Sequence, residues 1–118
     1  MHISEDYEAL LAEKGIDLSD LSIAGSALRR EDAFTAIKLL QRDSVPLLGG
    51  EVFLKENSKI SFPVDLWTCE QKRGDTIHAY AIRSGEDARA YITRLGDPTG
   101  KEFIFKFVVM DGTTPIPY

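Results

Sequence analysis

The chain has 118 residues, 43% of them hydrophobic and 28% charged, which is the composition of an ordinary globular domain. A chain of this length can bury one hydrophobic core, so we expect a single domain over residues 1–118. With 14 Lys and Arg against 19 Asp and Glu, the formal charge is -5, which disfavours binding to nucleic acid.

The N-terminal part of the chain predicts two helices. Residues 4–14 form the first, because Ser4 is a good capping residue and acidic side chains occupy the first turn. Residues 16–27 are rich in turn-forming side chains and predict a short strand or an irregular crossing. Residues 30–42 form the second and clearest helix, since apolar side chains recur at helical spacing until a Ser-Val-Pro sequence ends it.

Strand-like segments follow around a double glycine. Residues 45–48 predict a strand that enters Gly49-Gly50, and residues 51–55 either continue this strand or form its hairpin partner. Residues 76–83 alternate in polarity and predict a further strand.

Residues 60–71 also alternate between apolar and other side chains, and Pro63 within them indicates an edge strand or a bulge. The positions expected to face the core are Ile60, Phe62, Val64 and Leu66. Trp67 then has the opposite parity and faces solvent or a partner. An exposed tryptophan between acidic residues is typical of a protein-binding anchor. The alternative is a Trp67 that packs beneath the helix that follows.

The C-terminal part predicts a helix over residues 84–95 with Ser84 as its N-cap, then a strand over residues 102–111. Alternate phenylalanines of this strand are expected on one face: Phe103, Phe105 and Phe107. Residues 112–118 are expected to be loose. The element order predicts an α+β fold, with a mainly antiparallel sheet of four to five strands and two to three helices packed against it.

The sequence carries no pattern for a metal or a cofactor, and we expect neither. His2 and His78 have no further ligand at a suitable spacing. The double glycine lacks the Lys-Ser/Thr of a phosphate-binding loop. We therefore assign Gly49, Gly50 and Pro46 a structural role, the glycines at a bulge or bend where no side chain fits.

Two arrangements leave a small hydrolase as an alternative function. Asp65 and Glu70 could act as paired carboxylates in a small cleft beside Trp67. Cys69 could act as a nucleophile if the fold placed His78 beside it. Solvated edge-strand acids and an inert thiol are the simpler interpretation, and no catalytic signature surrounds these residues. A generic interaction or oligomerisation module that uses an edge strand is a further alternative.

The chain is expected to be cytoplasmic and to make no contact with a membrane. It shows no signal peptide, its apolar stretches are too short to span a bilayer, and its single cysteine suits a reducing compartment. The acidic excess lies in residues 1–20, which hold six acids and one base, whereas the remaining residues hold 13 of each.

Residues 20–110 resemble the immunity protein 40 family of bacterial polymorphic-toxin systems. The resemblance rests on segments in a fixed order, namely Glu31-Asp32-Ala33, Pro46-Leu47-Leu48-Gly49-Gly50-Glu51-Val52, Asp65-Leu66-Trp67 and Tyr91-Ile92. Glu51 stands where Asp is expected after the glycines, a mild departure from the pattern.

The resemblance implies a small, non-catalytic protein that binds a cognate toxin domain and neutralises it in the producing cell. The residues that we expect to contact the toxin are Trp67, Asp65, Glu70 and Glu51, followed by Asp17 and Asp20. If the toxin is basic, the acidic segment could accelerate binding by electrostatic steering, provided that the first helix borders the binding face.

Overall fold

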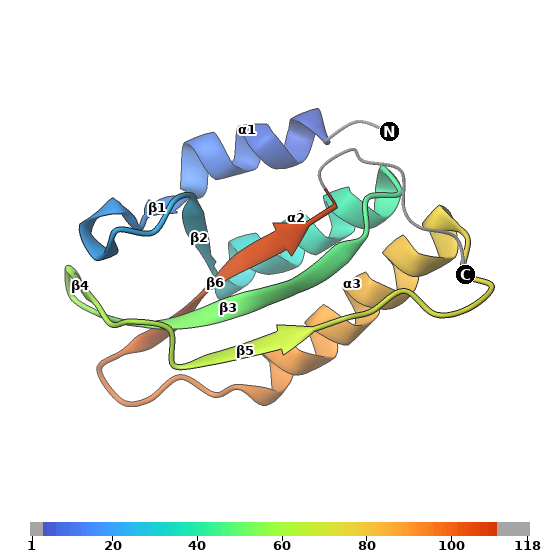
Figure 1. Ribbon diagram of the computed structural model, residues 1–118. Helices are drawn as coiled ribbons and strands as arrows, with labels where there is room; N and C mark the ends of the chain where they lie inside the picture. Colours follow the sequence, from blue (N-terminus) through green and yellow to red (C-terminus); the bar gives the residue numbers. More distant parts are fainter. Residues whose placement is uncertain (1–3, 111–118) are drawn as a thin grey trace.

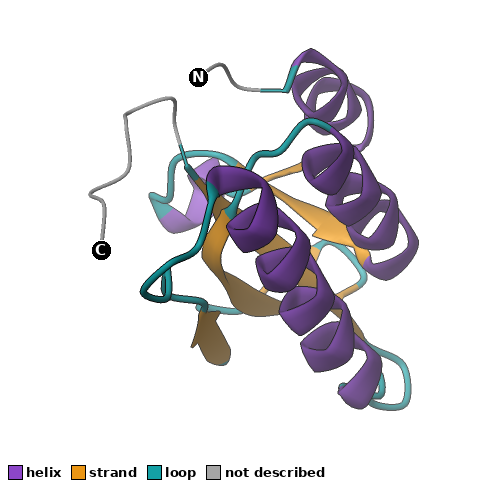
Figure 2. Cartoon of the chain, turned by 90° about the vertical axis from the view of Figure 1, so that its right-hand side faces the viewer, coloured by secondary structure: helices purple, strands orange, loops and turns teal. Residues whose placement is uncertain are grey.

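The computed structural model describes residues 4–110 and has an α+β fold, as the sequence predicts (Figure 1). Its elements in chain order are α1 (Glu5–Lys14), β1 (Ile16–Asp17), the 3-10 helix η1 (Ser19–Leu21), β2 (Ser26–Arg29), α2 (Arg30–Arg42), β3 (Leu47–Glu56), β4 (Lys59–Ile60), β5 (Asp65–Thr68), α3 (Ile77–Arg94) and β6 (Glu102–Val109). Figure 2 shows the α-helices gathered on one side of the sheet. His2 and residues 112–118 lie outside the described residues.

The sheet is antiparallel and is organised around β3. Its strand order is β1-β2-β6-β3-β4, and β5 pairs with β3 on the edge that β4 also uses. The longest pairing joins β3 to β6, from Leu47 opposite Val109 to Lys55 opposite Glu102. The sheet therefore exposes β5 at one edge, next to the strand that carries the double glycine.

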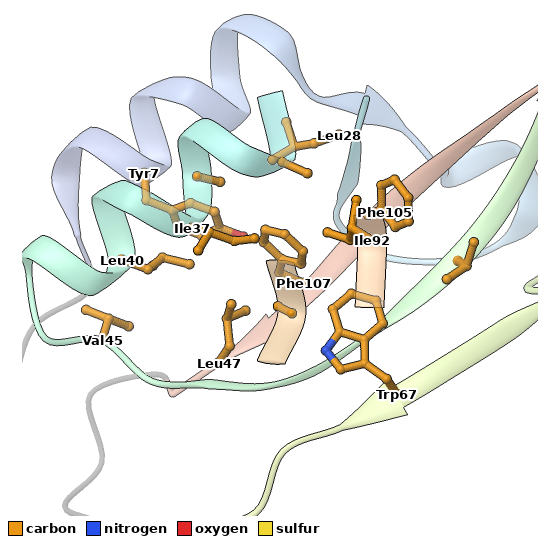
Figure 3. Packing of buried hydrophobic residues seen from close by; sticks show 14 residues of the cluster. Tyr7, Leu28, Ile37, Leu40, Val45, Leu47, Trp67, Ile92, Phe105 and Phe107 are labelled. Carbon is orange, nitrogen blue, oxygen red and sulfur yellow. The ribbon is translucent and has the colours of Figure 1, made fainter. Parts of the chain in front are cut away.

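The main core lies between the helices and the sheet (Figure 3). Helix α2 contributes Ala33, Ala36, Ile37 and Leu40. The alternate phenylalanines of β6 turn toward this core, with Phe105 and Phe107 buried and Phe103 packed against them, as predicted. A second, smaller cluster lies on the opposite face of the sheet and contains Leu18, Ala27, Phe53 and Ile104.

The first two helices agree with the sequence prediction. The Ser4 hydroxyl accepts a hydrogen bond from the Tyr7 amide, 3.3 Å away, and caps α1. Tyr7 is buried and attaches α1 to the main core. Strand β3 runs through Gly49 and Gly50 without interruption, so residues 51–55 continue the strand rather than form its hairpin partner.

The prediction of a strand over residues 76–83 is wrong, because these residues form the first half of α3. The N-cap is Thr76, whose hydroxyl accepts from the Ala79 amide at 3.0 Å. Ser84 lies buried inside the helix, where its hydroxyl accepts from the Leu47 amide at 2.9 Å. Tyr80, Ser84 and Ala88 are buried at spacings of four, so the apparent alternation belongs to the inner face of a helix.

Candidate protein-binding face

The sheet has an open face, which we define as the side turned away from the α-helices (Figure 2). The second cluster covers one part of this face. In β5 and the segment before it, three residues are more than half exposed: Phe62 (70%), Val64 (51%) and Leu66 (64%). The register opposite Glu51 places Leu66 on the open face. We call these three residues the β5 patch. Contiguous exposed apolar side chains of this kind are typical of an interaction site.

Trp67 points the other way, into the main core (Figure 3). Its ring stacks on Tyr91 of α3, with centroids 4.8 Å apart, and meets Phe107 edge-on at 5.9 Å. Gly50 is its register partner on β3, and a Cβ atom at Gly50 would lie 2.3 Å from the indole Cη2. The absence of a side chain at Gly50 thus makes room for the indole.

These contacts correct the predicted orientation of residues 60–71. The side chain of Trp67 is only 9% exposed, so it is not a surface anchor but packs beneath α3. Because neighbouring positions of a strand face opposite sides, an inward Trp67 turns Leu66 outward. Phe62 and Val64 are exposed as well, whereas Ile60 is half buried against the second cluster. Gly50, which leaves space for a large side chain on a neighbouring strand, was the signal that could have revealed this.

The predicted structural residues shape the start of β3. Gly49 has a φ of 154°, and a Cβ atom there would lie 2.3 Å from the Trp67 carbonyl oxygen. The register with β6 shifts between Leu47 and Gly49, which marks a β-bulge. Pro46 is buried, and its carbonyl accepts from the Met110 amide at 3.0 Å.

Glu51 lies on the open face, opposite Leu66 on one side and Lys106 on the other. Its carboxylate forms an ion pair with Lys106 at 3.9 Å. The structure therefore brings Glu51 beside the β5 patch, but with its charge already matched by a neighbouring lysine.

Asp65 and Glu70 do not form a pair. Asp65 accepts a hydrogen bond from the Tyr91 hydroxyl, and this bond, followed by one from the Leu66 amide, lowers the pKa of Asp65. Strand geometry alone places Asp65 and Thr68 roughly 10 Å apart, with Glu70 further along. The Glu70 side chain is exposed, while its carbonyl accepts from Arg83 at 3.0 Å.

Cys69 and His78 make contacts with other residues. Burial, followed by the nearby Asp87 carboxylate, raises the pKa of the Cys69 thiol, whose sulfur lies 3.3 Å from that carboxylate. A thiol held in its neutral form is a poor nucleophile. The His78 Nδ1 instead lies 3.0 Å from the Ser44 hydroxyl. Within residues 4–110, no cluster of three or more His, Cys, Asp or Glu side chains could hold a metal ion.

Asp17 and Asp20 lie apart from the other predicted site residues. Asp17 belongs to β1 and accepts from the Ser19 amide and hydroxyl at 3.0 and 2.8 Å, which lowers its pKa. Asp20 is exposed in η1. Strand β1 pairs with β2, so β6 and β3 stand between this acidic turn and β5.

A sequence model of the family described as immunity protein 40 matches residues 17–109, which include every strand of the sheet except the first residue of β1. No curated protein and no solved structure matches the chain.

Proposed function

The chain belongs to the immunity protein 40 family, and we propose that it neutralises a cognate toxin domain by stoichiometric binding in the cytoplasm of the producing cell. Family membership is the observation that carries this proposal, because it implies an immunity protein. The exposed β5 patch supports a protein partner, since it offers apolar area that a second protein can remove from water.

A binding mechanism without catalysis fits the chemistry of the predicted site residues. The Cys69 thiol is buried with a raised pKa, and His78 bonds to Ser44 rather than to Cys69. Asp65 begins β5, whereas Glu70 lies beyond the end of this strand at Thr68. No described helix is long and apolar enough to cross a membrane.

The test is neutralisation of the cognate toxin domain, to be sought as the C-terminal domain of the protein that the adjacent gene encodes. We expect the two purified proteins to elute as one complex, and toxin activity to fall linearly to zero at one equivalent of the chain. Complete loss of toxin activity at a small fraction of an equivalent of the chain would instead indicate that the chain is an enzyme. Absence of a complex together with unprotected cells would contradict the proposal.

A pair of variants separates binding from the alternative of a hydrolase. Cys69→Ala and Glu70→Gln remove the two groups with catalytic potential that lie next to each other in the sequence. We expect both variants to protect cells as well as the wild type, because neither residue belongs to the β5 patch. A complete loss of protection with unchanged folding and unchanged complex formation would favour the enzyme.

A further inference from the structure

We propose that the toxin docks on the β5 side of the open face, and that the toxin surface seated there is apolar and uncharged. This inference rests on the proposed function and adds the location and chemistry of the contact. The docking surface consists of the β5 patch together with Val108 of β6, which is 40% exposed.

The register of the sheet places Leu66 of β5 and Val108 of β6 on the open face, and Phe62 and Val64 are exposed in the segment that leads into β5. Glu51 of β3 lies opposite Leu66 of β5 on one side and opposite Lys106 of β6 on the other. Thr68, Gly49 and Val108 form the next row on the same face, because residues two apart in a strand point the same way. No side chain rises from the middle of this second row, since Gly49 has none. Thr68 and Val108 therefore flank Gly49, and Leu66 lies one row away on β5, opposite Glu51.

The charges define the partner. The charged residues in these two rows are Glu51 and Lys106, and they form an ion pair with each other, so the surface offers no net charge to a partner. The acidic excess of the chain lies in residues 1–20, and α1 packs against α2 and β2. In the sheet, β6 and β3 lie between β2 and β5. A basic partner would be drawn to α1, whereas the β5 patch matches an apolar surface.

The edge of β5 is protected, which favours docking on the face over strand pairing with a second copy. The strand has only four residues, and Pro63 before it lacks an N–H donor. Asp65 adds a charge at the edge, where the Tyr91 hydroxyl holds it. Short edge strands with charges and prolines resist edge-to-edge pairing. The exposed apolar area therefore remains available on the face alone.

The experiment measures the affinity of the full chain for the cognate toxin domain by calorimetry. Leu66→Asp and Phe62→Asp should each weaken binding by about 30-fold or more, the loss typical of a central interface residue. Ile82→Asp is the matched control, because Ile82 is a similarly apolar exposed residue (39%) but lies on α3. The control should bind like the wild type. Raising the salt from about 50 to 500 mM should change the dissociation constant by less than about threefold.

Folding of each variant is followed independently through Trp67, the single tryptophan, whose buried ring should keep its emission in a folded variant. If the wild type binds and both patch variants bind equally well, the docking surface is wrong while the proposed function stands. If the wild type does not bind the toxin, both are wrong. If Leu66→Asp instead dissociates a dimer of the free chain, the patch is a self-association surface and the inference is overturned.

Discussion

At the scale of single residues, the contact between Gly50 and Trp67 decides which side of β5 faces solvent. The indole fills the space above Gly50 and lies between Tyr91 and Phe107. Interiors are packed closely enough that one added methyl group at such a position forces side chains or backbone to move. The outward direction of Leu66 therefore depends on the absence of a side chain one strand away.

We expect Gly50→Ala to lower the free energy of unfolding by about 1–3 kcal/mol, because the new Cβ overlaps three carbons of the indole ring. Gly96→Ala is the control, since no atom lies within 4 Å of a Cβ there. Urea unfolding followed by Trp67 emission measures both variants. Equal stability of the two variants would show that the indole can move aside.

A second residue-scale prediction concerns Asp43, which binds α1 to the end of α2. Hydrogen bonds from Arg42 and then from Ser4 lower the pKa of Asp43 to about 2. A carboxyl whose pKa is lower in the folded state stabilises the protein above its unfolded pKa of about 4, and this stabilisation is lost as the pH falls toward 2. The wild type should therefore exceed Asp43→Asn in stability at pH 7.

The measurement is urea unfolding of both proteins between pH 7 and pH 2. The difference between them should be constant down to about pH 4 and shrink below it. Ser4→Ala removes one of the two donors and should show a smaller pH-dependent part, in addition to a pH-independent loss from the missing α1 cap. A difference that does not change with pH would contradict the assignment.

At the scale of elements, Thr76 and Ser84 have different roles in α3. Thr76 caps the helix from an exposed position, whereas Ser84 is buried in the middle of the helix and satisfies the Leu47 amide. An acidic side chain is a good N-cap but is costly when buried. Substitution by Asp therefore distinguishes the two positions.

We expect Thr76→Asp to retain wild-type stability and Thr76→Ala to lose about 1 kcal/mol, because the alanine cannot accept from the Ala79 amide. Ser84→Asp should lose more than either, and Ser84→Ala about 1–3 kcal/mol from the unsatisfied Leu47 amide. Thermal unfolding by circular dichroism measures all four. If Ser84→Asp kept wild-type stability, the result would favour Ser84 as the N-cap of the helix and contradict its buried position.

The elements that local chemistry determines were predictable, and those that tertiary packing determines were not. Helix α1 was found from its Ser4 cap and acidic first turn, and α2 from the helical spacing of its apolar side chains. The first half of α3 was missed because TIHAYAIR fits both a strand period and a helix period. The packing of α3 against β3 and α2 decides in favour of a helix, because it buries side chains at a spacing of four.

The candidate site was predicted in part. Glu51 lies on the open face, as a contact residue requires. Asp65 and Trp67 instead lie on the helix side of the sheet, where both contact Tyr91, and Phe62, Val64 and Leu66 are exposed. Alternation alone gives two faces without saying which one is buried, and the choice here depends on Gly50, on another strand. Asp17 and Asp20 lie beyond β6 and β3 from the β5 patch because strand order does not follow chain order.

At the scale of the whole molecule, α1 lies outside the part of the chain that the family model matches. The family match begins at residue 17, after α1 has ended at Lys14. Even so, Tyr7 is only 4% exposed and belongs to the main core. Helix α1 therefore contributes to stability, while the proposed docking surface lies across the sheet from it.

We expect Tyr7→Ala to lower the free energy of unfolding by about 3 kcal/mol, since it removes a buried ring from the main core. Glu13→Ala, an exposed change in the same helix, should stay within about 0.5 kcal/mol of the wild type. Both variants should bind the toxin with wild-type affinity at a temperature where they are folded. Reduced affinity of folded Tyr7→Ala would place α1 in the interface.

The position of β6 makes the assembly of the sheet depend on its last strand. This strand follows every other described element in the chain, yet it lies in the middle of the sheet and joins β2 to β3. A growing chain that has not yet added residues 102–109 holds two strand groups with no pairing between them, and it lacks Lys106 and Val108 of the proposed docking surface. The two halves of the sheet and the proposed docking surface therefore both depend on the last described strand of the chain.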